Sequence, residues 1–551
     1  MSVDTDNAAF QDALNLIQYT RQSVFLTGKA GTGKSTFLRY VCEHTKKKYV
    51  VLAPTGIAAI NAGGSTMHSF FKLPFYPLLP DDPNLSLQRG RIHEFFKYTK
   101  PHRKLLEQIE LVIIDEISMV RADIIDAIDR ILRVYSHNLR EPFGGKQLLL
   151  VGDVFQLEPV VKNDEREILN RFYPTPYFFS ARVFGQIDLV SIELQKVYRQ
   201  TDPVFVGVLD HIRTNTAGAA DLQLLNTRYG SQIEESEADM YITLATRRDT
   251  VDSINEKKLA ELPGESITFE GVIEGDFPES SLPTSQELVL KPGAQIIFIK
   301  NDFDRRWVNG TIGVIAGIDE EEETIYVITD DGKECDVKRD SWRNIRYRYN
   351  EKTKEIEEEV LGSFTQYPIR LAWAITVHKS QGLTFSRVVI DFTGGVFAGG
   401  QAYVALSRCT SLDGIQLKKP INRADIFVRP EIVNFAGRFN NRQAIDKALK
   451  QAQADVQYAA AARAFNKGDM EECLEQFFRA IHSRYDIEKP VPRRLIRRKL
   501  GIINTLKEQN KKLKEQMREQ QERLRQYAHE YLLMGNECIT QAHDIDRKSV
   551  V

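Results

Sequence analysis

The residues whose types and spacing point most directly to chemistry form the string GKAGTGKST, from Gly28 to Thr36. The string matches G-x-x-x-x-G-K-[ST] and stands between an apolar run and a helical pattern, as a phosphate-binding loop requires. Its glycines let backbone amides wrap phosphates, its lysine reaches the β- and γ-phosphates, and its serine hydroxyl is a ligand of Mg²⁺. We therefore expect ATP and Mg²⁺ as cofactors, bound by Gly28, Lys29, Ala30, Gly31, Thr32, Gly33, Lys34, Ser35 and Thr36.

Two carboxylates, Asp115 and Glu116, end the apolar run LVII. A carboxylate at the end of a buried strand beside such a loop can hold Mg²⁺, so we expect Asp115 as a metal ligand together with Ser35. Glu116 is then expected to orient the attacking water. Gln156 follows the run LLLVGD, where a neutral amide can sense the γ-phosphate. The alternative interpretations are a strand cap for the acidic pair and an ordinary surface glutamine.

Two arginines lie far downstream of the loop, Arg199 in VYRQ and Arg408 in ALSRC. Phosphate hydrolysis needs added positive charge on the γ-phosphate, and an arginine supplied from another domain contributes ~10³–10⁵ in rate. Because a lone arginine is usually solvated or salt-bridged, these two assignments depend on the motifs around them. The expected catalytic residues are Lys34, Asp115, Glu116, Gln156, Arg199 and Arg408.

The segments that position these residues have a pattern that predicts an α/β fold. Four apolar runs, VFLTG, YVVLAPTG, LVIIDE and LLLVGD, alternate with helical patterns between residues 23 and 153. None shows the polar alternation of a half-exposed strand, which predicts a parallel sheet covered by helices on both faces. Functional side chains should gather at the carboxyl ends of such strands.

A second α/β pattern covers about residues 189–262 and resumes at 365–427. Between its halves lie short strand patterns with an Asp331-Gly332 turn signal, which predict an inserted small β-barrel over about 263–364. The acidic runs 319–323 and 355–359 are expected to be solvated hairpin loops. A proline-rich stretch at about 74–104 predicts another small insertion.

The strand patterns end at about Arg429, and the rest is predicted to be helical. A heptad seam over about three repeats suggests a long helix or helical hairpin, and its residues are Ile503, Leu506, Asn510, Leu513, Met517, Gln520, Leu524 and Tyr527. The segment 464–481 is similar to a single tetratricopeptide-type repeat, fewer than a solenoid needs. The segment from Val491 to Tyr527 carries a net charge of +8. These basic residues either bind phosphates or keep the surface of a helix solvated.

Composition sets only broad bounds. The chain has 551 residues, with 74 Lys plus Arg against 76 Asp plus Glu, so a nucleic-acid surface has to be a local patch. Five widely spaced cysteines without a C-x-x-C pair argue against a zinc site and a disulfide framework, and favour a reducing cytoplasm. Neither a signal peptide nor a membrane segment is indicated, so we expect no membrane association.

The ordered set of motifs between Gln11 and Asp425 resembles the Pif1 family of superfamily-one DNA helicases. The motifs are GKAGTGKST, APTGIAAINAGGSTMHSFF, IIDEISMV, VGDVFQLEPV, YRQ, LAWAITVHKSQGLTF and QAYVALSRC. This resemblance implies ATP-dependent 5′-to-3′ translocation on single-stranded DNA and unwinding of duplexes and often of G-quadruplexes. Roles in repair, recombination or replication, telomere maintenance included, would follow, in a bacterial nucleoid or a nucleus.

The resemblance also implies an architecture. It predicts a first RecA-like motor domain over residues 1–188 with a wedge insertion at about 74–104, and a second over 189–428 with the β-barrel inserted. Residues 429–551 form a helical tail with coiled-coil or tetratricopeptide-like character, whose role does not carry over from the family.

The same resemblance assigns contacts. Gln11 falls where the family contacts adenine, and the expected DNA-binding residues are Thr66, His68, His378 and Ser380. Gln381 belongs to the same motif as the last two. Helix caps and core histidines are the alternative interpretations, while Phe70, Phe71 and Phe75 are either base-stacking or core residues. Glu158 departs from the family pattern, which has a second proline there.

The expected partners are single-stranded and forked DNA, and a protein bound through the helical tail. Two other functions stay open at this point. The chain could be a RecD-like motor subunit of a nuclease complex, or a P-loop ATPase switch that recruits proteins through its tail.

Overall fold

The computed structural model describes residues 4, 6–86, 91–200, 202–230, 240–304, 306–350, 352–353, 355–484 and 490–548. The chain divides into two compact units, Met1–Ala452 and Gln453–Val551. Among the described residues, none of the helices has the length and apolar character needed to cross a membrane.

The first unit is built on a six-stranded parallel sheet with the order β3-β2-β4-β5-β1-β6. Its strands are β1 Val24–Gly28, β2 Tyr49–Ala53, β3 Ser65–Thr66, β4 Leu111–Ile114, β5 Gln147–Val151 and β6 Val190–Leu194. Its helices are α1 Ala8–Tyr19, α2 Lys34–His44, α3 Gly56–Ala62, α4 Met67–Phe71, α7 Ala122–Tyr135 and α8 Asn163–Leu169. The four apolar runs form buried strands, because separate hydrophobic clusters cover the two faces of this sheet.

The first sheet extends past the expected domain boundary at residue 188. Strand β6 pairs in parallel with β1 over Val24↔Val190 to Gly28↔Leu194. The expectation that the second domain begins at residue 189 is therefore wrong. The change to the second sheet comes after Leu194, and the residues that follow lead to α9 Pro203–Arg213.

The proline-rich insertion packs onto the same core. It contains helix α5 Arg91–Phe95 and continues into α6 Lys100–Gln108. Leu78, Ile92 and Phe96 are buried with α7 in one hydrophobic cluster.

A second parallel sheet has the order β18-β7-β19-β20. Its strands are β7 Ile242–Ala245, β18 Ala374–Thr376, β19 Val388–Asp391 and β20 Ile415–Leu417. Its helices are α9, α10 Ala219–Asn226, α11 Arg248–Glu261 and α12 Gln401–Leu406. The two α/β sheets confirm the predicted fold class, and α12 carries the chain toward Arg408.

The insertion between α11 and β18 consists mainly of strands, as expected, with one short 3-10 helix at Glu279–Ser281. Its strands form antiparallel sheets of five, three and two strands, with the orders β14-β13-β12-β11-β17, β15-β16-β9 and β10-β8. The strands are β8 Ile267–Glu270, β9 Val272–Gly275, β10 Glu287–Leu290, β11 Gln295–Phe298, β12 Ile312–Asp319, β13 Thr324–Thr329, β14 Glu334–Val337, β15 Asp340–Asn350, β16 Glu355–Gln366 and β17 Ile369–Leu371.

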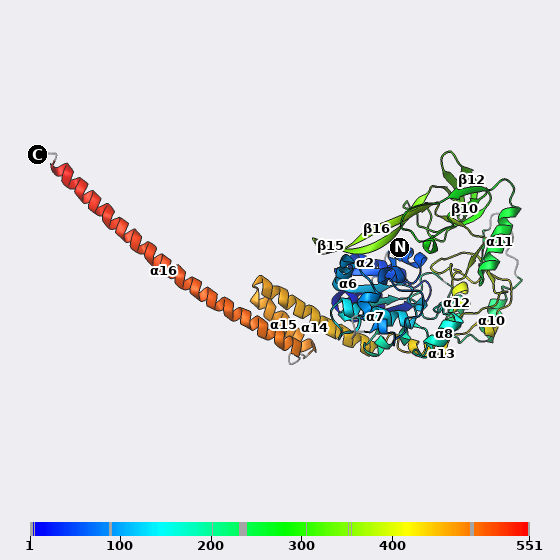
Figure 1. Ribbon diagram of the computed structural model, residues 1–551, viewed down its shortest axis with the longest axis horizontal. Helices are drawn as coiled ribbons and strands as arrows, with labels where there is room; N and C mark the ends of the chain where they lie inside the picture. The colour runs from blue at the N-terminus through cyan, green and yellow to red at the C-terminus, as the bar shows by residue number, and fades with distance from the viewer. Residues whose placement is uncertain are drawn as a thin grey trace. The chain divides into compact units, whose positions relative to one another are not determined.

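The long β15–β16 hairpin reaches the first sheet and lies against α6 (Figure 1). Tyr347 and Tyr349 are buried in the hydrophobic cluster of the first sheet, and the N–H of Val51 donates to the Tyr347 hydroxyl at 3.4 Å. The acidic run 355–359 lies in β16, so its expected place in a loop is wrong. Arginines on β15 face these glutamates across the ladder, which makes the run compatible with a strand.

The start of the expected tail belongs to the first unit. Helix α13 Pro430–Ala436 places Phe435 in contact with the Phe179 ring at 4.4 Å and the Phe25 ring at 5.7 Å. Ile445, in the following helix, is buried against α1 and α2. The predicted tail boundary at residue 429 is therefore wrong, because this aromatic and aliphatic segment completes the core of the first sheet.

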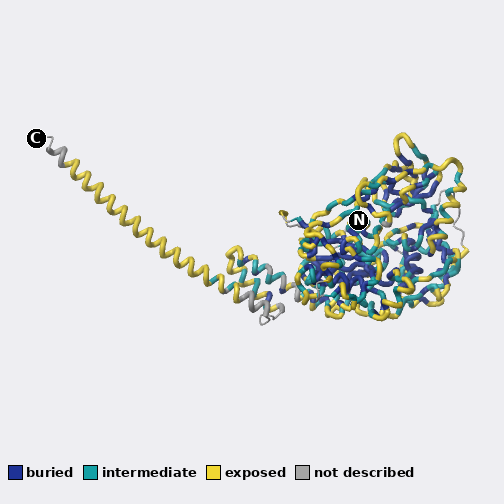
Figure 2. Tube along the Cα trace, viewed as in Figure 1, coloured by how far each residue is buried: buried dark blue, intermediate teal, exposed yellow. Residues whose placement is uncertain are grey.

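The second unit is entirely helical over its described residues. It contains the end of α14 Arg442–Lys467, then α15 Met470–Arg484 and α16 Pro490–Lys548. Tyr458 and Phe477 pack together at 5.8 Å, so α14 and α15 form one helical hairpin. The segment 464–481 covers only the end of α14 and most of α15, and its similarity to a tetratricopeptide-type repeat stays a prediction. The heptad residues lie on α16, whose described C-terminal part is exposed (Figure 2). Side chains 491–496 of the basic run lie outside the described residues.

Candidate nucleotide site and DNA-facing residues

The predicted phosphate-binding loop connects β1 to α2, as expected from its pattern. Gly31 and Gly33 have positive φ values of 78° and 88°, and a Cβ on Gly31 would lie 2.4 Å from the Cβ of Arg199. Only glycine therefore fits at Gly31. Lys34 turns back over the loop, where its ammonium donates to the carbonyl oxygens of Gly28 at 2.7 Å and Lys29 at 3.0 Å. Burial lowers the pKa of Lys34, although nearby carboxylates favour its charged form.

The other residues of the loop have separate surroundings. Lys29 forms an ion pair with Asp210 of α9. The hydroxyl of Thr32 is held by the Lys29 carbonyl at 2.9 Å, while Ser35 is exposed in the first turn of α2 and Thr36 is half-buried. Of these side chains, the hydroxyl of Ser35 is the one that solvent reaches most freely.

Asp115 and Glu116 follow β4 at the carboxyl edge of the sheet, as expected. The Glu116 N–H donates to the Asp115 carboxylate at 2.9 Å, and Glu116 adopts the left-handed backbone conformation with φ 49°. Burial raises the pKa of both groups, and burial together with the negative charge of Asp115 brings that of Glu116 to about 7. A half-buried acid with a strained backbone at this edge is typical of a functional position.

Gln156 is buried in the loop after β5, where its amide lies 3.5 Å from the carboxylate of Asp153. Asp153 also accepts two hydrogen bonds, at 3.0 and 3.2 Å, from Arg213 at the end of α9. Arg213 pairs with Glu193 of β6 at 2.9 Å and lies over the Phe155 ring at 4.4 Å. This buried arginine joins the first sheet to a helix of the second α/β unit. The sequence does not single it out, because HIR at a helix end carries no distinguishing signal.

Arg199 and Arg408 come together from two segments of the second α/β unit. Arg199 donates to the Ser407 carbonyl at 3.1 Å. Arg408 is 2% exposed, and its guanidinium bonds to neutral groups, including the Val404 carbonyl at 3.0 Å and the Ser407 hydroxyl at 3.1 Å. Burial, together with the positive charge of Arg199, lowers the pKa of Arg408 to about 9. A buried and a half-buried cation close together favour the arrival of an anion.

Tyr403 is a second residue that sequence analysis missed. It lies on α12, and its hydroxyl accepts a hydrogen bond of 3.0 Å from the N–H of Ala30 in the phosphate-binding loop. At the start of the same helix, a Cβ on Gly400 would lie 2.3 Å from the Gln156 carbonyl oxygen. The helix that leads to Arg408 therefore touches both the loop and the segment that holds Gln156. The motif QAYVALSRC contains this tyrosine but does not reveal where its hydroxyl points.

Gln11, the expected adenine contact, lies on α1 and is half-buried. Its contact with adenine stays a prediction. Tyr198, next to Arg199, lies beside the loop, 3.9 Å from where a Cβ on Gly33 would be. Its ring is 42% exposed and its hydroxyl donates to Asp4 at 2.8 Å. Tyr198 offers a flat apolar surface that sequence analysis did not single out.

The expected DNA contacts of the first sheet lie around α4. Thr66 caps this helix by accepting the Ser69 N–H at 3.2 Å, which matches the alternative interpretation. His68 stacks on Phe75 at 4.9 Å, and Phe75 is 83% exposed, so the two rings form an exposed platform. Phe70 and Phe71 are buried in the core, which agrees with the second of the two interpretations.

The contacts expected from the second unit differ from one another. His378 is half-buried, and burial lowers its pKa. Ser380 is fully buried: its hydroxyl donates to the Val377 carbonyl at 2.7 Å and its carbonyl accepts from Arg408 at 3.4 Å. The expectation that Ser380 contacts DNA is therefore wrong in this structure. The turn after β18 instead uses it to position Arg408.

Glu158, the departure from the family pattern, has its own partners. Its carboxylate accepts from the Tyr177 hydroxyl at 3.0 Å and pairs with Arg429 at 2.9 Å. The loop after β5 is therefore tied to the residue that precedes α13.

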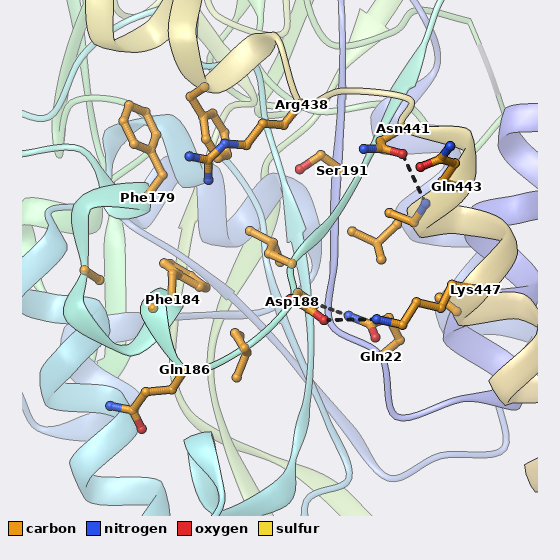
Figure 3. Close-up of a pocket in the computed structure, with 18 residues that line it drawn as sticks. Gln22, Phe179, Phe184, Gln186, Asp188, Ser191, Arg438, Asn441, Gln443 and Lys447 are labelled. Atoms are coloured by element: carbon orange, nitrogen blue, oxygen red, sulfur yellow. Dashed lines mark hydrogen bonds and ion pairs between the residues drawn. The ribbon is translucent and has the colours of Figure 1, made fainter.

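A separate hollow of about 890 Å³ lies between the residues that lead into β6 and the connection from α13 to α14 (Figure 3). Lys447 pairs with the Asp188 carboxylate at 3.9 Å, and Gln22 donates to the Asp188 carbonyl. The polar groups that line this hollow bond to one another across the junction of the first sheet with the residues after α13. We therefore assign no ligand to the hollow.

Known proteins resemble most of this chain. The profile of the PIF1-like helicase family matches residues 4–207. The ATP-dependent DNA helicase Pif1 of Bdellovibrio bacteriovorus is 31% identical over 439 residues, which cover 78% of this chain and 90% of that protein. Human ATP-dependent DNA helicase PIF1 is 33% identical over 72% of this chain, which spans 58% of the human protein.

A solved structure agrees with these sequence matches. The structure of Bacteroides sp Pif1 in complex with ADP-AlF4 is 41% identical, covers 79% of this chain and 97% of its own, and has a TM-score of 0.72. Identity above 30% over nine-tenths of a bacterial relative leaves no other assignment: the chain belongs to the Pif1 family and is an ATP-dependent DNA helicase.

Proposed function

We propose that ATP bound at the 28–36 loop drives stepwise 5′-to-3′ movement along single-stranded DNA by closing the two α/β sheets on each other. One observation carries this proposal. Side chains from the second sheet's helices reach the loop directly, through Tyr403 on Ala30 and Asp210 on Lys29. Any ligand that changes the loop must therefore change contacts between the two sheets.

The residues present fit a bound Mg²⁺. Ser35 offers an exposed hydroxyl and Asp115 a carboxylate, which are the hard oxygen donors that Mg²⁺ prefers. When bound with ATP, Mg²⁺ neutralises charge that develops on the phosphates.

The positions of the chain's own groups support the following proposed roles. Glu116, a half-buried acid with a pKa of about 7, orients the attacking water and accepts its proton. Gln156 reads the γ-phosphate through its amide. Arg199 and Arg408 donate to neutral carbonyl groups, which leave their positive charges uncompensated. They turn to the γ-phosphate and stabilise the transition state. Lys34 exchanges its carbonyl partners for phosphate oxygens.

The adenine is placed by neighbouring residues. Tyr198 lies beside the loop with an exposed ring, and Gln11 lies on the helix that precedes β1. We propose that the base stacks on Tyr198 and hydrogen-bonds to Gln11.

Single-stranded and forked DNA are the proposed substrates. Solved structures of Bacteroides Pif1 include one bound to single-stranded DNA and one at forked double-stranded DNA. In this chain the platform of His68 and Phe75 suits base stacking. Thr66 and His378 are the proposed phosphate contacts, since the Thr66 hydroxyl accepts the Ser69 N–H as a helix cap and keeps its own proton to donate. Ser380 acts by holding Arg408 and not by touching the strand.

The test is ATP turnover with and without single-stranded DNA, for the natural chain and for Lys34→Ala. We expect strong stimulation by DNA in the natural chain and none in the variant, with the same melting temperature. Unwinding is then compared on 5′-tailed and 3′-tailed duplexes, forks and quadruplexes. Unwinding of 3′-tailed duplexes alone would refute the proposed polarity, and ATP turnover that ignores DNA would refute the motor.

A further inference from the structure

The seam of helix α16 is exposed although it has the pattern of a buried interface. In the heptad frame, Ile503, Asn510, Met517 and Leu524 occupy position a. Leu506, Leu513, Gln520 and Tyr527 occupy position d. The exposed fraction of the side chains is 50% for Leu506, 56% for Leu513, 60% for Met517 and 66% for Leu524. A stripe of this kind on a helix of 59 residues is expected to be covered by another helix.

The polar residues of the seam indicate what covers it. Asn510 and Gln520 interrupt the apolar positions, and a polar residue at a seam position costs stability unless it meets a polar group. In a parallel, in-register pair of identical helices, each meets its own copy, and every apolar residue also meets its own copy. A partner of unrelated sequence would have to supply polar groups at the same two levels.

The charged residues beside the seam agree with this pairing. In a parallel pair, position g of one helix lies beside position e of the next heptad on the other. The pairs formed are Gln509 with Lys514, Gln516 with Gln521, and Arg523 with Ala528, and none brings like charges together.

The opposite orientation is disfavoured by charge. An antiparallel pair that aligns Asn510 with Gln520 brings Lys514 of one copy beside Lys514 of the other. The glutamates at position f, which are Glu508, Glu515 and Glu522, lie on the outer face in either orientation. Repulsion between like charges at the flanks therefore selects the parallel arrangement.

We infer that α16 forms a parallel, two-stranded coiled coil with α16 of a second copy of this chain, so that two helicase chains are joined through their C-terminal helices. The inference is independent of the proposed mechanism, because it uses residues 503–541 alone. Cys538 continues position a seven residues after Tyr531 and is exposed. In this arrangement, the two Cys538 side chains face each other at a separation that suits a disulfide.

The test is the mass of the full chain in reducing buffer, by light scattering and sedimentation over a range of concentrations. We expect twice the chain mass of 63.0 kDa. Leu513→Glu with Leu524→Glu should return the mass to that of one chain. Thr505→Glu with Gln526→Glu adds the same charge on the outer face and should leave the mass doubled. All variants should retain DNA-stimulated ATP turnover, which shows that the motor has folded.

Orientation is tested by mild oxidation. We expect a covalent dimer in the natural chain, and its loss in Cys538→Ser. A natural chain that keeps the mass of one copy at tens of micromolar overturns the inference, as does a mass of three or more copies. A doubled mass without the Cys538 cross-link overturns the parallel register, and a doubled mass in the Leu513→Glu, Leu524→Glu variant shows that the copies meet elsewhere.

Discussion

Replacing Tyr403 by Phe should tighten ATP binding. The substitution removes the hydroxyl oxygen and keeps the buried aromatic ring. In the structure this oxygen accepts the N–H of Ala30 at 3.0 Å, and loop amides of this kind are the groups that bind phosphate oxygens. The hydroxyl and the phosphate therefore compete for one donor. Without the hydroxyl, the donor is free for the phosphate.

The size of the effect follows from that hydrogen bond. A buried bond between neutral groups is worth about 1 kcal/mol net. Loss of the competitor should thus lower the Kd for ATP by roughly five-fold, since 1.4 kcal/mol corresponds to about ten-fold. The variant should also couple nucleotide binding less tightly to closure, because α12 no longer holds the loop.

The assay is an equilibrium titration with a fluorescent, slowly hydrolysed ATP analogue in Mg²⁺ buffer. Tyr177→Phe is the matched control: it removes another buried tyrosine hydroxyl, which donates to Glu158 at 3.0 Å in the loop after β5. Its Kd should equal that of the natural chain. An unchanged or higher Kd in Tyr403→Phe, with an unchanged melting temperature, would refute the competition between hydroxyl and phosphate.

Three further outcomes are expected. Arg408→Ala should lower DNA-stimulated turnover by about 10³-fold or more with little change in ATP affinity, and full turnover would remove it from catalysis. Burial lowers the pKa of His102 to about 4, so its contribution to stability is complete above pH 6.5 and is lost as the pH falls toward 4. Between pH 7.5 and 5 the natural chain should lose about 2 kcal/mol of unfolding free energy that His102→Phe does not lose, as measured by urea unfolding. Phe435→Ala should cost about 3 kcal/mol in the same assay, and a negligible cost would mean that α13 is not part of the core.

The nucleotide loop and the first sheet could be predicted because their signals are local. A strand covered on both faces, such as β4, must be apolar throughout, and a phosphate loop needs glycines at fixed spacing. The same reasoning identified Asp115 and Glu116, since they directly follow such a strand.

The features that were missed depend on contacts between distant segments. The residue pattern of β6 is compatible with either sheet, and only its pairing with β1 shows that it belongs to the first. The run of glutamates in β16 is compatible with a strand because arginines such as Arg346 lie opposite, at 2.7 Å from Glu359. Burial of Ser380 and the interdomain position of Arg213 likewise depend on neighbours far away in the sequence.

The β15–β16 hairpin changes what kind of motion the two sheets can make. The chain crosses from the first sheet to the second after Leu194 and returns to the core of the first sheet at α13, and the hairpin adds a third attachment through Tyr347 and Tyr349. Two bodies joined at three separated places can move only as far as these connections bend or release. While the hairpin stays in contact, opening and closing over the nucleotide should therefore be a small motion, and sliding or twisting of the sheets is suppressed.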